Sequence, residues 1–152
     1  MARRGRPPLP RPLALAHAPG VAGGCTTLPN MPNIRLGSIS LDCADPLALG
    51  SFWAELLGGE IAYSSEEFVA VQADRIWLTA VRIPDFAPPT WPEGGRPKQM
   101  HLDLAVDHLD QAEREAVGLG AVPAADQTSP ERFRVFFDPA GHPFCLSTQI
   151  PE

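Results

Sequence analysis

The sequence contains one pattern twice, and this repeat limits the folds that are open to the chain. Each copy begins with an aspartate suited to a helix N-cap, Asp45 or Asp107, and ends with a helix-stopping glycine, Gly58 or Gly120. The two starts and the two ends are separated by the same 62 residues, although few residues are identical between the copies. A repeat in the order of elements is typical of a duplicated α+β unit.

Strand patterns surround both helices. The residues of each predicted strand alternate in polarity or form short apolar runs, and turn signals separate them. The predicted strands lie at 34–43, 60–64, 67–72, 75–83, 98–106, 121–124, 132–137 and 143–149. We therefore predict an α+β fold of two tandem βαβββ modules, which form a curved mixed sheet around a shared cleft. Such a cleft is the default place for a ligand.

The chain divides into an extension and one domain. The extension at 1–31 is rich in proline and arginine and has no hydrophobic periodicity, so we expect it to be disordered. Two alternatives are open. The extension is a secretion signal that is cleaved, although Pro19 interrupts its apolar stretch, or it is absent because translation starts at Met31. The domain spans 32–152, with module one at 34–83, a proline-rich loop at 84–97 and module two at 98–150.

Charge and cysteine content exclude several classes of partner. The whole chain carries a formal charge of -6, and four arginines lie in the first 30 residues, so residues 31–152 carry -10. A domain this acidic repels phosphate backbones, so we expect no nucleic-acid partner. No apolar run reaches the roughly 20 residues that span a bilayer, and we expect no membrane partner. Three cysteines without tight spacing favour a cytoplasmic protein without a disulfide framework.

Four stretches together resemble a known superfamily. They are LDCADPLALGSFWAELLGG at 41–59, PPTWPEGG at 88–95, HLDLAVDHLDQAE at 101–113 and FFDPAGHPFCL at 136–146. The chain resembles the vicinal oxygen chelate superfamily, which includes glyoxalase I, extradiol dioxygenases and bleomycin-resistance proteins. It looks most similar to small bacterial glyoxalase-like domain proteins. The resemblance implies the glyoxalase/bleomycin-resistance fold and a homodimer.

The resemblance also implies where a metal would bind. Metal-using members take ligands from the first and last strands of each module, and these positions fall here at Ser38 or Ile39, near Trp77 to Thr79, at His101 and at Cys145. Only His101 is a conventional ligand, and Cys145 stands where glutamate is usual. A catalytic metal generally needs three protein donors. We therefore expect no metal and no other cofactor; if a metal binds, His101 and Cys145 are its expected ligands.

His101 is the candidate catalytic residue, as an acid/base group or as a substrate-binding histidine. Strand alternation places Gln99, His101 and Asp103 on one face, where Asp103 would orient the imidazole ring. A histidine that only packs and hydrogen-bonds is the alternative. Cys145 is expected to point into the same cleft, as a nucleophile beside His101 or, more simply, as a small buried apolar residue.

Other candidates for substrate binding come from both modules. Trp91 in the loop would stack on a flat ligand, or else anchor the loop or a dimer contact. Ser38, Ser40 and Asp42 would give the cleft wall polar groups. Arg134 shares a strand face with Phe136 and would bind an anionic ligand, unless it is a surface arginine. His108 and His142 are not expected to be catalytic.

Three functions fit these observations. In the first, the protein binds or sequesters a small organic molecule in the cleft between the modules, as bleomycin-resistance proteins do, without the usual metal. In the second, it is a metalloenzyme of lyase, isomerase or dioxygenase type that uses His101. In the third, it is a non-catalytic accessory module. Because this fold hosts many chemistries, the sequence does not identify a substrate.

Overall fold

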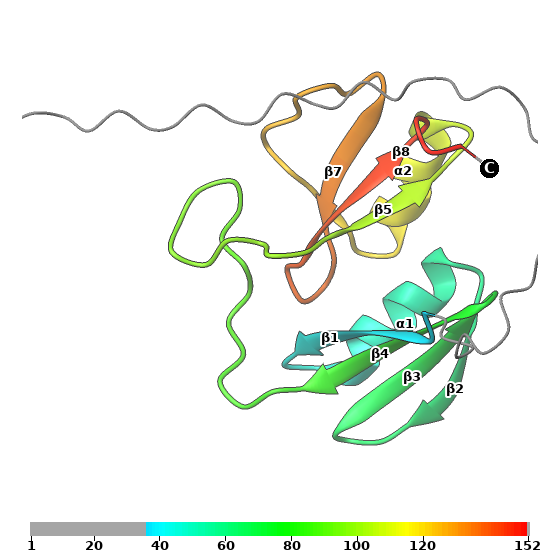
Figure 1. Ribbon diagram of the computed structural model, residues 1–152, viewed down its shortest axis with the longest axis vertical. Helices are drawn as coiled ribbons and strands as arrows, with labels where there is room; N and C mark the ends of the chain where they lie inside the picture. The colour runs from blue at the N-terminus through cyan, green and yellow to red at the C-terminus, as the bar shows by residue number, and fades with distance from the viewer. Residues whose placement is uncertain (1–35, 152) are drawn as a thin grey trace, which may run out of the picture. The chain divides into compact units, whose positions relative to one another are not determined.

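The computed structural model describes residues 36–151, which belong to one compact unit. The extension predicted at 1–31 lies outside these residues. The two βαβββ modules predicted from the repeat are present, and each forms its own four-stranded mixed sheet (Figure 1). The predicted α+β fold is therefore confirmed.

Module one contains four strands and one helix in the predicted order. They are β1 (Ser38–Cys43), α1 (Pro46–Leu56), β2 (Glu60–Ser64), β3 (Phe68–Ala73) and β4 (Ile76–Arg82). The strand order is β1-β4-β3-β2. Strand β1 pairs with β4 in parallel, and the other two pairs are antiparallel.

Module two repeats this arrangement. Its elements are β5 (Leu102–Ala105), α2 (Leu109–Gly118), β6 (Val122–Pro123), β7 (Phe133–Phe137) and β8 (Pro143–Ser147). The strand order is β5-β8-β7-β6, and β5 and β8 form the parallel pair. The parallel pairing brings the first and last strands of the module side by side. The candidate site forms on these two strands.

The predicted capping signals succeed at one helix and fail at the other. Asp45 accepts hydrogen bonds from the amides of Leu47 and Ala48, and Gly58 follows the helix with a φ of 61°. At α2 the N-cap residue is His108, whose side chain makes no capping hydrogen bond. The prediction that Asp107 caps this helix is therefore wrong by one residue.

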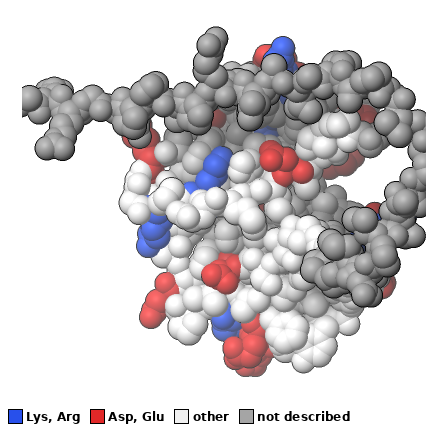
Figure 2. Space-filling view, in the orientation of Figure 1, with Lys and Arg blue, Asp and Glu red and all other residues white. Residues whose placement is uncertain are grey.

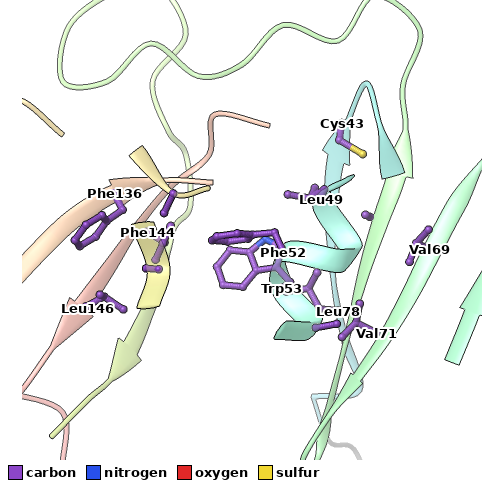
Figure 3. Packing of buried hydrophobic residues seen from close by; sticks show 14 of the residues in the cluster. Cys43, Leu49, Phe52, Trp53, Val69, Val71, Leu78, Phe136, Phe144 and Leu146 are labelled. Atoms are coloured by element: carbon purple, nitrogen blue, oxygen red, sulfur yellow. The ribbon is translucent and has the colours of Figure 1, made fainter. Parts of the chain in front are cut away.

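One cluster of buried apolar residues contains side chains from both modules. Phe52 and Trp53 of α1 point toward Phe136 and Phe144 of the second sheet (Figure 3). The Trp53 and Phe144 rings meet edge to face with centroids 5.3 Å apart. Phe52 and Trp53 therefore belong to the core, and they join the two modules.

The proline-rich segment between β4 and β5 is held by its own polar contacts. The backbone amide of Thr90 donates to the Arg96 carbonyl at 2.7 Å, and the Arg96 amide donates to Thr90 Oγ1 at 3.0 Å. Gly94 lies directly against Thr90, where a side chain would clash. These contacts close the loop and present Trp91 to the second sheet.

None of the described helices is long and apolar enough to cross a membrane.

Candidate functional site

Three predicted site residues meet at the beginning of the second sheet. Asp103 and Cys145 are register partners on the parallel strands β5 and β8. His101 lies just before β5, with its Nε2 atom 3.3 Å from Oδ1 of Asp103. One ligand-type atom from each residue lies within 4.8 Å of the others. His101 and Cys145, whose proximity the sequence left open, are therefore close together.

These residues line a pocket of about 340 Å³. Trp91 and Phe133 supply its apolar surface, whereas Lys98, Thr128 and Ser147 add polar groups. The Trp91 ring packs at 6.2 Å from the ring of Phe137, and Lys98 Nζ lies 5.1 Å from the Trp91 ring centre. Trp91 thus anchors the loop on the sheet and also forms a wall of the pocket, so two of its proposed roles coexist.

The Cys145 thiol is held in its protonated form. Burial raises the pKa of this thiol to about 11, and the hydrogen bond and negative charge of Asp103 add to the effect. Lys98 acts in the opposite direction but is outweighed. A nucleophilic cysteine needs a lowered pKa, so this environment favours a buried, inert thiol at neutral pH. The cluster packs Cys145 with Ala124 and Val135.

The donor set of the cluster nevertheless suits a metal ion. An imidazole, a carboxylate and a sulfur are ligands that zinc accepts, and three protein donors with an open position are typical of a catalytic zinc site. The expected ligand pair of His101 and Cys145 gains Asp103 as a third donor. A metal bound here would require Cys145 to release its proton to solvent, so that the thiolate could act as a ligand.

The polar residues of β1 do not join this cluster. Ser38 Oγ lies 3.3 Å from Oγ1 of Thr79 on the neighbouring strand, so the pair forms a hydrogen bond within the first sheet. Ser40 and Asp42 line a different pocket of about 530 Å³, which also includes residues of the loop and His142. The structure therefore separates the polar groups of β1 from His101.

Gln99 departs from the predicted strand. Strand β5 begins at Leu102 rather than at residue 98, and Gln99 has a φ of 53° in the left-handed region. This turn breaks the alternation that was to place Gln99 beside His101 and Asp103. Gln99 instead lines the larger pocket together with Ser40 and Asp42.

Arg134 lies on the opposite face of β7 from the His101 pocket. Its guanidinium forms ion pairs with Asp110, at 2.7 Å, and with Glu113, both on α2. These two carboxylates raise the pKa of Arg134 further above its usual value. The arginine thus fastens the helix to the sheet, and its binding of an anionic ligand stays a prediction.

Sequence reasoning missed two groups that face pockets. Lys98 lines both pockets, and its position three residues before His101 in the sequence could have indicated this. His142 lines the larger pocket and pairs with the buried Asp138. The DPAGHP turn suggested only backbone shaping, because the spacing of an aspartate and a histidine in a turn does not show where the ring points.

Comparisons with known proteins agree with this architecture. The glyoxalase-like domain family matches residues 38–147. A solved structure of the fosfomycin resistance protein FosX from Mesorhizobium loti is similar with a TM-score of 0.59 at 15% identity. The match covers 76% of this chain and 92% of that one.

Two further structures show the same fold. A mutant FosX from Listeria monocytogenes, in complex with Mn(II) and 1S,2S-dihydroxypropylphosphonic acid, has a TM-score of 0.58 at 15% identity and covers 79% and 93% of the two chains. A glyoxalase family protein from Enterococcus faecalis has a TM-score of 0.55 at 20% identity and covers 74% and 96%. Comparison with curated proteins gives no significant match. The chain belongs to the glyoxalase-like domain family, within the vicinal oxygen chelate superfamily.

Proposed function

We propose that this domain binds a small organic molecule in the pocket of His101, Asp103 and Cys145, without the catalytic metal usual in the superfamily. The observation that carries the proposal is the state of Cys145, which occupies the usual position of a glutamate ligand. Its thiol is buried beside Asp103, its register partner, and has a pKa raised to about 11 by burial and by this carboxylate. The carboxylate that could attract a metal thus already stabilises a protonated neighbour.

The walls of the pocket indicate what kind of molecule fits. Trp91 and Phe133 offer aromatic surface for a flat apolar group. His101, Asp103 and Lys98 offer both donors and acceptors at one end. A small aromatic molecule with one polar end satisfies both surfaces. His101 binds the polar end and is the candidate acid/base group if the ligand reacts.

The test is a screen of small aromatic carboxylates, phenols and amines in the presence of a chelator, read by melting temperature and by NMR. Ligands should raise the melting temperature because they bind the folded state alone. His101→Ala and Trp91→Ala should abolish this shift while the protein stays folded. His108→Ala, an exposed histidine at the start of α2, is the matched control and should retain the shift. Binding that survives both pocket substitutions would refute the proposal.

The second candidate function is that of a metalloenzyme of lyase, isomerase or dioxygenase type. The observation that favours it is the set of three donors within 4.8 Å. Metal bound by His101, Asp103 and Cys145 would supply a Lewis acid to a substrate oxygen. Elemental analysis of the purified protein and calorimetric zinc titration decide between the two functions. Near-stoichiometric metal that Cys145→Ser removes would establish the second; metal well below one equivalent, without zinc binding, supports the first.

We also propose that the protein forms a homodimer in the cytoplasm. The face of the first sheet that points away from α1 exposes the stacked pair Tyr63 and Phe68, together with Trp77. Uncharged side chains cover much of the face seen in Figure 2, with charged residues scattered among them. An exposed patch of this kind is typical of an interaction surface. Light scattering should give twice the chain mass, and Tyr63→Glu should give monomers; a monomeric wild type would contradict the proposal.

A cytoplasmic location agrees with Cys43 and Cys145 being unpaired.

A further inference from the structure

Outside the His101 pocket, the structure contains a second histidine that is held by a buried carboxylate. Asp138 is 3% exposed, and its Oδ2 atom lies 3.0 Å from Nδ1 of His142. The same carboxylate accepts hydrogen bonds from the backbone amides of Ala140 and His142, each at 2.9 Å, and from the Trp53 indole at 3.2 Å. The Asp138 side chain is therefore fully occupied.

This contact determines which nitrogen of the ring is available. Because a carboxylate only accepts, Nδ1 of His142 carries the hydrogen, and Nε2 of the neutral ring presents a lone pair. The ring packs at 5.6 Å from the ring of Phe86 and lines the pocket of about 530 Å³. Since Nδ1 is bound to Asp138, Nε2 is the ring nitrogen that remains available to a ligand in this pocket.

The imidazole is not needed to satisfy Asp138. Without it, this carboxylate keeps two backbone donors and the Trp53 indole. Asp138 therefore positions the His142 ring, and not the reverse. The other ring nitrogen, Nε2, has no hydrogen-bond partner among residues 36–151. A carboxylate that orients a histidine is a frequent device where the other ring nitrogen binds a ligand.

The remaining walls of this pocket define a ligand class. Arg96 and Lys98 bring two positive charges, against one negative charge from Asp42. This local positive balance contrasts with the acidic domain and favours an anion. Phe86, Pro89 and Met100 provide apolar surface. The available nitrogen of His142 accepts a hydrogen bond, so it pairs with a hydroxyl of the ligand.

We propose that this pocket is a second binding site, and that it takes a small organic carboxylate that also carries a hydroxyl group. Arg96 and Lys98 bind the carboxylate, His142 accepts from the hydroxyl, and Asp138 is a positioning residue. The site shares Lys98 with the His101 pocket, but His101, Asp103 and Cys145 do not line it, so the two sites can be tested separately.

The experiment is an NMR titration of the labelled full chain with the three isomers of hydroxybenzoate, which vary the separation of hydroxyl and carboxylate. Benzoate lacks the hydroxyl, and the hydroxybenzamides lack the charge. We expect at least one hydroxybenzoate to bind saturably, with shifts at Ser40, Phe86 and His142. Both control compounds should bind at least about tenfold more weakly, as expected for one lost hydrogen bond or ion pair.

His142→Asn separates the two possible roles of the histidine. Asparagine can still donate to Asp138 but cannot present Nε2, so hydroxybenzoate binding should weaken about tenfold while benzoate binding stays the same. His108→Asn, at an exposed histidine that lines neither of these two pockets, is the matched control and should leave hydroxybenzoate binding intact. The proposal is overturned if no isomer binds, if the shifts map only to the His101 pocket, or if His142→Asn binds as well as the wild type. Long-range nitrogen spectra of the wild type check the tautomer even if the variant unfolds; a hydrogen on Nε2 alone would also overturn it.

Discussion

The indole nitrogen of Trp53 donates a hydrogen bond to Oδ2 of Asp138 at 3.2 Å, and this bond joins helix α1 of module one to the β7–β8 turn of module two. Trp53 is 1% exposed and Asp138 3% exposed, so no solvent competes for the contact. A buried polar pair of this kind fixes how two apolar surfaces meet. The two modules are thereby stabilised as one unit.

This contact allows a test of how much the joining of the two modules contributes to stability. Trp53→Phe removes the donor and part of the ring, and we expect the free energy of unfolding to fall by about 2–3 kcal/mol. The measurement is urea denaturation followed by circular dichroism. Trp77→Phe on the exposed face of β4 is the matched control and should cost less than about 0.5 kcal/mol. Equal losses in the two variants would show that the bond to Asp138 does not matter.

Much of the fold followed from turn residues and periodicity in the sequence. Asp45 and Gly58 mark the ends of a helix through their own backbone and side-chain chemistry, which needs no tertiary context. Strand alternation likewise agrees with the structure at Cys145, which packs in a different cluster from its neighbours Phe144 and Leu146 because β8 is regular.

The parts of the site that were missed depend on local breaks or distant partners. Gln99 adopts a positive φ, and no residue near it signals that the strand starts later. The sequence placed Arg134 on the same strand face as Phe136, but its partners Asp110 and Glu113 are recognisable only once α2 packs on β7. The face of a residue could therefore be predicted, whereas the groups it meets could not.

Cys145 should react slowly with alkylating agents at neutral pH. Because its pKa is about 11, only the small thiolate fraction reacts, and the rate should rise about tenfold per pH unit below that value. Asp103→Asn removes the charge that helps to raise the pKa and should speed alkylation. Mass spectrometry of the Cys145 peptide gives the rate. Asp74→Asn in an exposed turn is the control; if it accelerates alkylation equally, the assigned role of Asp103 is wrong.

The same thiol should make stability depend on alkaline pH. Its folded pKa of about 11 lies above the ordinary value of 9.0, so the stabilisation is complete below pH 9.0 and is lost as pH rises toward 11. Across this window the unfolded chain releases a proton that the folded chain keeps. We expect the wild type to lose about 2 kcal/mol more than Cys145→Ala between these pH values. Parallel curves for the two proteins in urea denaturation would contradict the raised pKa.

Arg134→Met should test whether the arginine fastens α2 or binds a ligand. The substitution keeps most of the packing stem but removes the ion pairs with Asp110 and Glu113. Because the Arg134 side chain is 22% exposed and Asp110 78% exposed, we expect a loss of only about 1 kcal/mol. Ligand affinity in both pockets should stay the same, as measured by NMR titration. A large loss of affinity for an anionic ligand would restore the role that the sequence suggested.

The close approach of α1 to β3 leads to a prediction with a built-in rescue. Gly50 lies on α1 where a β-carbon would overlap the Val69 side chain. Gly50→Ala gains about 1 kcal/mol of helix propensity, but the overpacking should cost more and give a net loss of about 1–2 kcal/mol. Val69→Ala opens the space and alone leaves a cavity. In the double variant the alanine fills part of that cavity, so its loss should be smaller than the sum of the two single losses. Denaturant unfolding of all four proteins measures this coupling. Additive losses would show that the helix can shift away from the strand without cost, and that glycine is not required at this crossing.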